Sequence, residues 1–262
     1  MKIVLGIALV LVLTGCSAEE PTQGVLRVCL GQSDPPRAQE SPFEGLDVDV
    51  ARFLADGLNR ELQPVWLATP NPTEIESTDV DYGPLLTGRC DVQMSIPGVD
   101  ALGAFAPRLV LTQPYYGAGF ELVPAAANIE FDAPGDHRIA VRGNTVAHVV
   151  IDRFGFDWTM RDDSVDIVAA VASGEAEAGL VWGPDLAAVE MSRNLEYEPP
   201  AVLRWNHHVA TRAADTALRD AINAVLVRAV VRDEILNSMF RHGVPARRPF
   251  ATVHSSEMLR RQ

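Results

Sequence analysis

Lysine is almost missing from this chain: Lys2 is the only lysine, and the other 21 of the 22 basic residues are arginine. Aromatic residues make up 6% of the 262 positions, and cysteine occurs three times. The sequence contains no Gly-x-Ser-x-Gly motif, no Walker phosphate loop and no dinucleotide-binding fingerprint. It also has no cluster of His, Cys, Asp and Glu at metal-ligand spacing. These absences argue against an enzyme, and they predict no metal and no cofactor.

Long apolar runs are absent as well. The run over residues 3–13 follows Lys2 and is too short to span a bilayer as a helix. Because small residues come directly after it, the run is typical of a secretory signal. Residues 13–16, Leu-Thr-Gly-Cys, resemble the lipobox of bacterial lipoproteins, in which Cys16 is lipidated. The alternative is an ordinary signal peptide with an incidental cysteine.

The lipobox interpretation sets the expected location. Residues 1–16 are then a lipoprotein signal peptide, and residues 17–24 form a polar tether. Ser17, rather than Asp, follows the lipidated cysteine, and by the lipoprotein sorting rule this favours the outer membrane. We therefore expect a periplasmic protein that reaches the membrane only through its lipid.

Positive charge is in short supply. Once Lys2 is removed with the signal peptide, 21 arginines face 35 acidic residues, which leaves a net charge of −14. Such a chain is poorly suited to nucleic acid or to anionic lipid surfaces. It is better suited to a basic protein partner.

Two cysteines remain after lipidation, Cys29 and Cys90. Each lies at the edge of a predicted strand, residues 26–30 and 90–96, and an exported compartment permits disulfides. If the two strands are neighbours, a bridge is geometrically possible. It would contribute about 4 kcal/mol in the chain-entropy model. The alternative is a pair of buried free thiols.

Hydrophobic periodicity predicts two series of strands and helices. In the first, strands at 26–30, 62–67 and 90–96 alternate with helices at 45–58 and 80–87. The second has strands at 138–142 and 178–182, helices ending at Phe154 and spanning 165–173, and a helix from Asp185. Extended segments at 107–123 and 202–211 join the series, and two amphipathic helices follow at 217–230 and 232–242.

This order predicts an α/β protein of two lobes with a double crossover. The predicted first lobe holds residues 25–118 and 210–250, the second lobe holds 119–209, and residues 251–262 form a tail. Ligand sites favour domain interfaces and the carboxyl ends of strands. The cleft between the lobes is therefore the expected site.

Several motifs resemble, in order and spacing, the family-3 solute-binding proteins, which are type II periplasmic binding proteins. They are residues 43–51 (FEGLDVDVA), 85–92 (LLTGRCDV), 114–116 (PYY) and 170–177 (AVASGEAE). The resemblance covers about residues 25–245. It implies two β/α lobes joined by two crossover strands, with the ligand between them.

The same comparison argues against a standard amino acid as ligand. Typical amino-acid receptors of this family pair the ligand carboxylate with an arginine and its ammonium with an aspartate. The arginine position falls near Phe105, with Arg108 three residues late, and the aspartate position falls at Trp182 and Gly183. A zwitterion would be costly to bind without both partners.

A subgroup shares these departures. Cys29 and residues 88–97 (GRCDVQMSIP), 181–184 (VWGP) and 242–245 (HGVP) resemble the binding-protein homologues associated with quinoprotein dehydrogenases. Residues 33–36 and the alanine pair 187–188 depart from that pattern. The resemblance implies an accessory protein of a PQQ-dependent (methanol or alcohol) dehydrogenase system, with the dehydrogenase or its cytochrome c as partner.

Two alternatives stand beside the accessory role. In the first alternative, the chain is the binding protein of an ABC importer. Its partner is then the permease, and its ligand is a small polar solute other than a standard amino acid. An enzyme like cyclohexadienyl dehydratase is a more distant possibility, and no acid–base pair in the sequence supports it.

The candidate residues for the cleft are Asp34, Ser95, Tyr115, Tyr116, Arg142, Asn144, Thr145, Trp182 and Gly183, of which Asp34, Ser95 and Arg142 are implied by the family resemblance alone. For the two tyrosines, lining the cleft and packing in the hinge are equal alternatives, and for the tryptophan, packing competes with ligand stacking. The Asn-Thr pair begins a helix, where it would bind an anion through backbone N–H groups or act as an ordinary cap.

Two other polar groups are expected to be structural. The aspartates of the first helix, Asp47, Asp49 and Asp56, predict a solvated surface. His207 and His208 are neighbours in a predicted strand, so their side chains point to opposite faces and do not form a metal pair.

Overall fold

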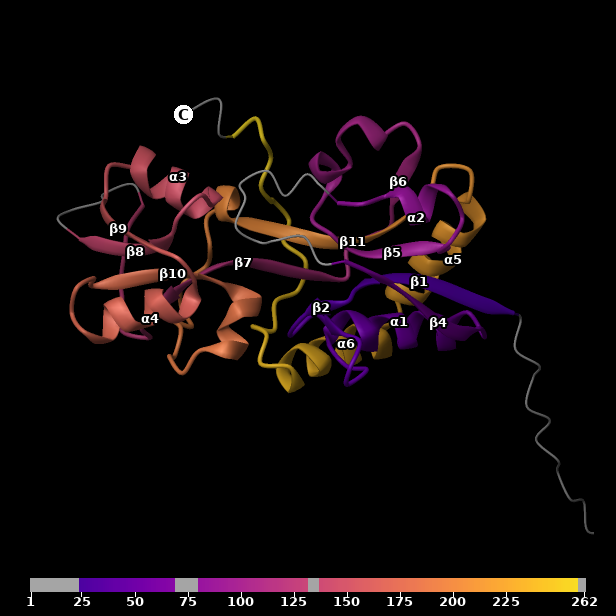
Figure 1. Cartoon of the computed structure of the whole chain (residues 1–262), viewed down its shortest axis with the longest axis horizontal. Helices are drawn as coiled ribbons and strands as arrows, with labels where there is room; N and C mark the ends of the chain where they lie inside the picture. The colour runs from indigo at the N-terminus through magenta and orange to yellow at the C-terminus, as the bar shows by residue number, and fades with distance from the viewer. Residues whose placement is uncertain (1–23, 69–79, 132–136, 259–262) are drawn as a thin grey trace, which may run out of the picture.

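The computed structural model describes residues 24–68, 80–131 and 137–258 (Figure 1). The predicted lipobox with Cys16, and most of the predicted tether, therefore lie outside the described residues. One mixed sheet runs through the molecule in the order β4-β1-β5-β11-β7-β10-β8-β9, with β6 also paired to β11. No helix among the described residues has both the length and the apolar character needed to cross a membrane.

The first lobe is built on parallel strands, as its β/α pattern predicts. Strand β1 (Val25–Gly31) pairs in parallel with β4 (Glu61–Leu67) and with β5 (Val92–Ile96). Helix α1 (Leu46–Gly57) lies between β1 and β4 in the chain and buries its apolar face against this sheet. Helix α2 covers only Gly83–Leu86, although a helix was expected over residues 80–87. Pro84 fits only the first helical turn, and Gly88, with a φ of 77°, lies two residues after the end of the helix.

The second lobe repeats the arrangement. Its parallel strands are β10 (Ala178–Trp182), β8 (Arg138–Arg142) and β9 (Asp157–Arg161), and its helices are α3 (Val146–Arg153) and α4 (Ser164–Ala172). Strand β9 was not expected from the sequence. It is an edge strand with no fully buried residue, so it lacks the apolar run that marks the other strands. The helix expected from Asp185 is instead a 3-10 helix, η2 (Gly183–Ala188), which begins directly after β10.

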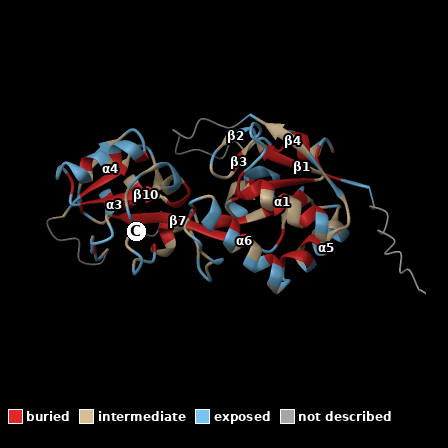
Figure 2. Ribbon diagram, turned by 90° about the horizontal axis from the view of Figure 1, so that it is seen from below, coloured by how far each residue is buried: buried red, intermediate tan, exposed pale blue. Residues whose placement is uncertain are grey.

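Two long strands connect the lobes. Residues 116–119 of β7 (Tyr116–Val123) pair in antiparallel fashion with residues 204–207 of β11 (Arg204–Arg212). Beyond this pairing β7 continues along β10, while β11 continues along β5 and along β6 (Leu109–Leu111). Each lobe has its own buried core, and the buried strand β7 runs between the two in Figure 2. The lobe boundaries predicted near residues 118 and 209 fall within these strands and stay predictions.

The chain after β11 returns to the first lobe and then to the crossovers. Helix α5 (Thr216–Leu226) ends four residues before its predicted end, and helix α6 (Ala229–Arg241) begins three residues before its predicted start, with residues 227 and 228 between them. From Val244 to Met258 the chain then runs alongside β7 and β11 (Figure 1). We call this stretch the C-terminal strap. It includes residues 251–258, which the sequence suggested only as a tail.

Backbone contacts join the strap to both crossover strands. The Gly117 N–H donates to the Arg247 carbonyl at 3.1 Å, and the His254 N–H donates to the Arg204 carbonyl at 2.7 Å. A Cβ at Gly117 would lie 2.7 Å from the Phe250 ring, so only glycine permits this close approach. The strap is therefore packed into the hinge.

A buried ion pair fastens the strap further. The Glu121 side chain in β7 is 0% exposed, and Arg247 of the strap reaches its two carboxylate oxygens at 2.5 and 2.7 Å. Arg193 of the second lobe approaches the same carboxylate at 3.4 Å. Burying a carboxylate is costly unless it is paired in this way.

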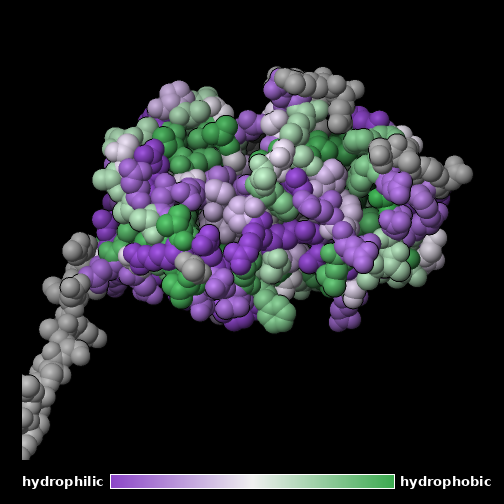
Figure 3. Space-filling model, turned by 180° about the vertical axis from the view of Figure 1, so that it is seen from behind, coloured by the Kyte–Doolittle hydropathy of each residue, from purple (hydrophilic) through white to green (hydrophobic). Residues whose placement is uncertain are grey.

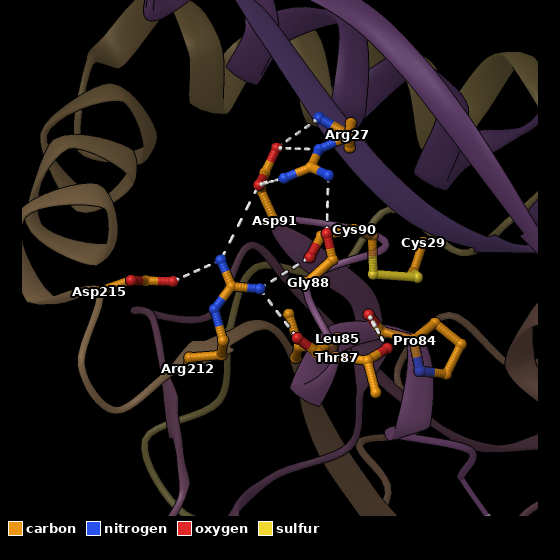
Figure 4. A network of polar contacts seen from close by, with 10 residues as sticks. All are labelled: Arg27, Cys29, Pro84, Leu85, Thr87, Gly88, Cys90, Asp91, Arg212 and Asp215. Carbon is orange, nitrogen blue, oxygen red and sulfur yellow. Dashed lines mark hydrogen bonds and ion pairs between the residues drawn. A yellow bond between two sulfur atoms is a disulfide. The ribbon is translucent and has the colours of Figure 1, made fainter.

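The two cysteines lie at the other end of the first lobe (Figure 4). Cys29 in β1 and Cys90 just before β5 are joined by a disulfide that closes a separation of 61 residues. Beside it, Asp91 accepts from the Arg27 guanidinium at 2.5 Å and lies 3.8 Å from that of Arg212. These groups surround the start of β5, whereas Ser95 lies near its end. The Gly-Arg-Cys-Asp motif thus serves the framework of the first lobe.

The surface seen from behind is mixed (Figure 3). A band of hydrophilic residues crosses the middle of this face, and apolar patches lie above and below it. The band interrupts the apolar surface, so this face carries no single continuous apolar area.

Candidate functional site

The centre of the candidate site is a hydrogen-bonded group in the first lobe. The Tyr115 hydroxyl donates to Asp47 Oδ1 at 2.6 Å and accepts from the Ser95 N–H at 3.1 Å. Asp47 is only 3% exposed, so its assignment to a solvated helix surface was wrong. It lies in the first turn of α1, on the side of the helix that Tyr115 covers.

Burial dominates the electrostatics of this group. It raises the pKa of Asp47 to about 6, although the charge of Arg37 and the hydrogen bond from Tyr115 act in the opposite direction. Burial also raises the pKa of the Tyr115 hydroxyl well above its ordinary value. Tyr115 therefore stays a neutral donor, and Asp47 changes charge near neutral pH.

Arg37 supplies the positive charge of the site. It lies in the turn of a small hairpin, β2 (Ser33–Asp34) and β3 (Ala38–Gln39), which the sequence did not reveal. Its guanidinium forms an ion pair with Asp34 Oδ2 at 2.7 Å, and its side chain is 25% exposed. Burial opposes its charge, but Asp34, Tyr116 and Asp47 outweigh this and hold its pKa above the ordinary value.

His207 and Tyr116 form a buried, stacked pair beside Ser95. Their rings stack with centroids 4.5 Å apart, and Ser95 Oγ lies 3.3 Å from His207 Nδ1. Burial, followed by the charge of Arg37, lowers the pKa of His207 well below its ordinary value, so the ring is neutral. Its Nε2 atom is buried and has no hydrogen-bond partner among the described residues. His208, the other member of the pair, bonds the Thr112 carbonyl instead.

Ser95 itself has an unusual backbone. Its φ of 63° is in the left-handed region, which is uncommon for residues other than glycine. The pairing of β5 with β11 shifts register around it. Such strain is held in place by surrounding contacts and is often found at functional sites. We call the following residues the cleft cluster: Asp34, Arg37, Asp47, Ser95, Tyr115, Tyr116 and His207.

Trp182 lies at the end of β10 and packs against the cores of both lobes. Its ring centroid is 5.4 Å from that of Phe120, 5.6 Å from Trp205 and 6.2 Å from His207. These contacts fit the packing alternative and also place one edge of the ring near the cleft cluster. At Gly183 a Cβ would lie 3.0 Å from the Gly119 carbonyl oxygen. A side chain at position 183 would therefore point at the crossover strand.

The remaining candidates lie in the second lobe. Thr145 Oγ1 donates to the Arg142 carbonyl at 2.8 Å and accepts from the His148 N–H at 3.3 Å, which is the geometry of an N-cap. Asn144 precedes it with a φ of 56°. No hydrogen bond in the described part of the chain joins Asn144 or Thr145 to the cleft cluster.

Asp185 connects the second lobe to the site and was not among the candidates. Burial raises its pKa, while a 2.8 Å hydrogen bond from Ser164 and the charges of Arg37 and Arg142 act in the opposite direction. The charge of Arg37 in the first lobe thus acts against the effect of burial on the pKa of Asp185 in the second lobe. In sequence, Asp185 follows the Gly-Pro step after β10, which marks a strand end but gives no sign of burial.

A separate pocket of about 280 Å³ opens beside the hairpin, between the first lobe and η2. None of the nine candidate residues lines it. Its lining consists of Pro35, Pro36, Ala38, Gln39, Glu44, Gly45, Ala187, Ala188 and His242. Within the described ranges, no group of three or more His, Cys, Asp and Glu side chains could hold a metal ion.

Known proteins share this architecture. Protein MoxJ of Methylorubrum extorquens is 25% identical over 270 residues, covering 87% of this chain and 83% of that protein. The crystal structure of MxaJ from Methlophaga aminisulfidivorans has a TM-score of 0.59 at 20% identity and covers 84% of this chain and 99% of its own. The fold is that of the type II periplasmic binding proteins.

A Streptococcus pneumoniae domain supports the same fold. It is the second substrate-binding domain of a candidate amino-acid ABC transporter, with a TM-score of 0.66 at 14% identity, and it covers 83% of this chain and 99% of its own. No family model matches the sequence. The resemblance that the motifs predicted, to these binding proteins and to MoxJ and MxaJ, is confirmed.

Proposed function

We propose that this chain is a lipid-anchored periplasmic binding-protein homologue that acts as an accessory protein of a PQQ-dependent alcohol dehydrogenase system. The observation that carries the proposal is that the charged side chains of the cleft cluster already have partners within the protein. Arg37 pairs with Asp34, and the Asp47 carboxylate accepts from Tyr115. The similarity to MoxJ over 87% of the chain supports the same role.

An amino-acid receptor needs a different site. It must offer one cation to a carboxylate and one anion to an ammonium, both within the cleft. Here the strand end that would carry the anion is Trp182–Gly183, and a side chain at 183 would meet β7. The charged group beside that position is Glu121, 3.6 Å from a Cβ at 183, and it is already paired with Arg247, so a ligand ammonium would have to displace that arginine.

The partner should be basic. The net charge of −14 without the signal peptide favours encounter with a positively charged protein, such as a cytochrome c or a basic face of the dehydrogenase. The attraction should weaken steeply with salt, since exposed charges are screened over about 10 Å at 0.1 M.

Binding and thermal-shift measurements test the proposal. The purified chain, with its disulfide intact, would be titrated against the dehydrogenase and its cytochrome c from the same cell at low and high salt. We expect saturable, salt-dependent binding to at least one of them. The same chain would be screened against metabolites, where saturation at a hundredfold excess stabilises by about 2.7 kcal/mol. A clear shift with one polar solute, and no binding to either protein, would overturn the proposal.

A solute receptor for an ABC importer is the second candidate. The observation that favours it is the buried Nε2 of His207, which has no partner among the described residues and could meet a ligand atom. A His207→Phe variant separates the two functions. It should abolish a solute-induced shift if the chain is a receptor and leave binding to a protein partner unchanged if it is an accessory protein.

The lipid anchor is a further part of the proposal. Cys16 would carry the lipid and the outer membrane would hold it. Metabolic labelling with a fatty acid should mark the natural chain but not a Cys16→Ser variant. Equal labelling of both chains would refute the assignment.

A further inference from the structure

The C-terminal strap is fastened to a different lobe at each end. At its start, Val244 follows α6 and is buried in the core of the first lobe. At its end, Met258 packs against the core of the second lobe. Between these points the strap crosses the hinge beside β7 and β11, where its yellow trace can be followed in Figure 1. The strap is therefore a connection between the lobes in addition to the two crossover strands.

Hydrogen bonds reinforce the attachment to the second lobe. The Arg247 guanidinium donates to the Tyr197 carbonyl at 3.0 Å, and His254 Nδ1 lies 2.7 Å from the Val202 carbonyl oxygen. Tyr197 and Val202 both pack in the core of that lobe. The strap thus meets the second lobe at positions well separated along its own length.

The strap also returns to the first lobe after it has crossed the hinge. The N–H and the hydroxyl of Ser256 both donate to Asp100 Oδ2, at 2.7 and 2.9 Å. Asp100 belongs to the 3-10 helix η1 (Val99–Phe105), which lies between β5 and β6 in the chain. His254 and Met258, on either side of Ser256, contact the second lobe instead. The end of the strap therefore holds both lobes within five residues.

Phe250 contacts both crossover strands at the same level of the hinge. Its N–H donates to Asn206 Oδ1 at 2.8 Å, and its carbonyl accepts from Asn206 Nδ2 at 2.9 Å. Its ring occupies the space beside Gly117, and the Arg204 guanidinium lies 4.8 Å from the ring centroid. Gly117 and Asn206 are paired with each other in the β7–β11 ladder. Bending of the ladder at this pair would pull Phe250 away from one strand or the other.

We propose that the C-terminal strap locks the hinge and holds the two lobes at one fixed angle. Closure of a two-lobed protein needs backbone rotation at a few residues of the connecting strands. Here such a rotation would break the contacts of Phe250, and a relative movement of the lobes would break those of His254 or Ser256. The cleft then keeps one opening and presents a pre-organised surface, which lowers the cost of binding a partner.

The distance between the lobes, measured by electron paramagnetic resonance, tests the lock. Spin labels would be attached to Asp56→Cys on α1 and Asp166→Cys on α4, two exposed positions on different lobes. Cys16→Ser in the same chain and the absence of reductant, which keeps the Cys29–Cys90 disulfide, confine the labels to these positions. We expect one narrow distribution of distances for the chain with its strap intact.

A chain that ends at Arg248 removes the lock and keeps the buried ion pair of Arg247 with Glu121. Its distribution should become broader and gain a second population at a shifted distance. Arg248→Ala in the complete chain is the matched control. It breaks only the exposed pair with Asp233, so its distribution should stay narrow.

Two results would overturn the proposal. One is a broad distribution in the complete chain, because the lobes would then move with the strap in place. The other is an unchanged narrow distribution in the shortened chain, because the hinge would then be rigid without the strap.

A second variant covers the case in which the shortened chain does not fold. Phe250→Ala combined with Ser256→Pro removes the ring beside Gly117 and both donors to Asp100, and it leaves the length of the chain unchanged. A distribution as narrow as that of the complete chain would again count against the lock. These measurements use neither a partner nor a solute, so their outcome is independent of the proposed function.

Discussion

Replacing Asp47 by asparagine should remove a pH dependence of stability. The pKa of this buried carboxyl is raised from 3.8 to about 6, so the folded protein binds its proton more tightly than the unfolded chain does. The stabilising effect of that proton is complete below pH 4 and is lost as pH rises through 6. A difference of this size corresponds to about 3 kcal/mol between acidic and neutral pH. Asparagine has nearly the same shape, can still accept from Tyr115, and does not titrate.

Urea denaturation at pH 4, 5, 6 and 7.5 measures the effect. We expect the free energy of unfolding of Asp47→Asn, relative to the natural chain, to rise by about 2.5 kcal/mol over this range, because pH 4 already lies just above the ordinary pKa of 3.8. Comparison at each pH cancels the contributions of other groups, such as Asp49 and Asp91, whose pKa values are lowered in the folded state. Asp56→Asn on the exposed side of the same helix is the matched control and should give a constant difference. A constant or falling difference for Asp47→Asn would refute the reasoning.

Three further predictions concern the framework. Arg247→Ala removes the main partner of the fully buried Glu121 and should lower the free energy of unfolding by about 3–5 kcal/mol. The control Arg248→Ala breaks an exposed pair and should change the free energy of unfolding by less than about 1 kcal/mol. Equal losses in the two variants would contradict this prediction. Replacing both Cys29 and Cys90 by serine should lower the free energy of unfolding by about 2–4 kcal/mol, measured by urea titration without reductant. No change would mean that the disulfide does not stabilise the fold. Gly183→Asp should lower the Tm and gain no amino-acid binding by calorimetry, because its carboxylate would face the Gly119 carbonyl and the buried Glu121; a gain of binding would show that only a charge was missing.

The lobes and the crossovers were predictable because they rest on repeated patterns. Apolar runs bounded by glycine and proline mark β1, β5 and β10, and the periodicity of α1 marks its buried face. Elements without such a pattern were missed. Edge strand β9 buries no residue fully, and the hairpin around Arg37 has strands of only two residues.

The site was less accessible to sequence reasoning than the fold. Tyr115 and Ser95 were candidates, and they meet in space through a hydrogen bond. Arg37 and Asp47 were not recognised, because an arginine in a loop and an aspartate at a helix start usually face water. Their burial depends on tertiary contacts between segments far apart in the chain, such as the 68 positions between Asp47 and Tyr115. The only feature of the sequence that pointed to Arg37 was its position three residues after Asp34, a spacing that suits an ion pair.

The route of the C-terminal strap has a consequence for how the molecule assembles. The strands that join the lobes are made in the middle of synthesis, but the Gly117 N–H and the Glu121 carboxylate receive their closest partners from Arg247, which is made much later. In a nascent chain that has not yet produced the strap, the buried Glu121 carboxylate lacks its closest partner and keeps only the Arg193 contact at 3.4 Å. The strap therefore completes a structure begun more than a hundred residues earlier, and a chain truncated before Val244 should be more sensitive to proteolysis at the hinge, because Glu121 would lack its closest partner.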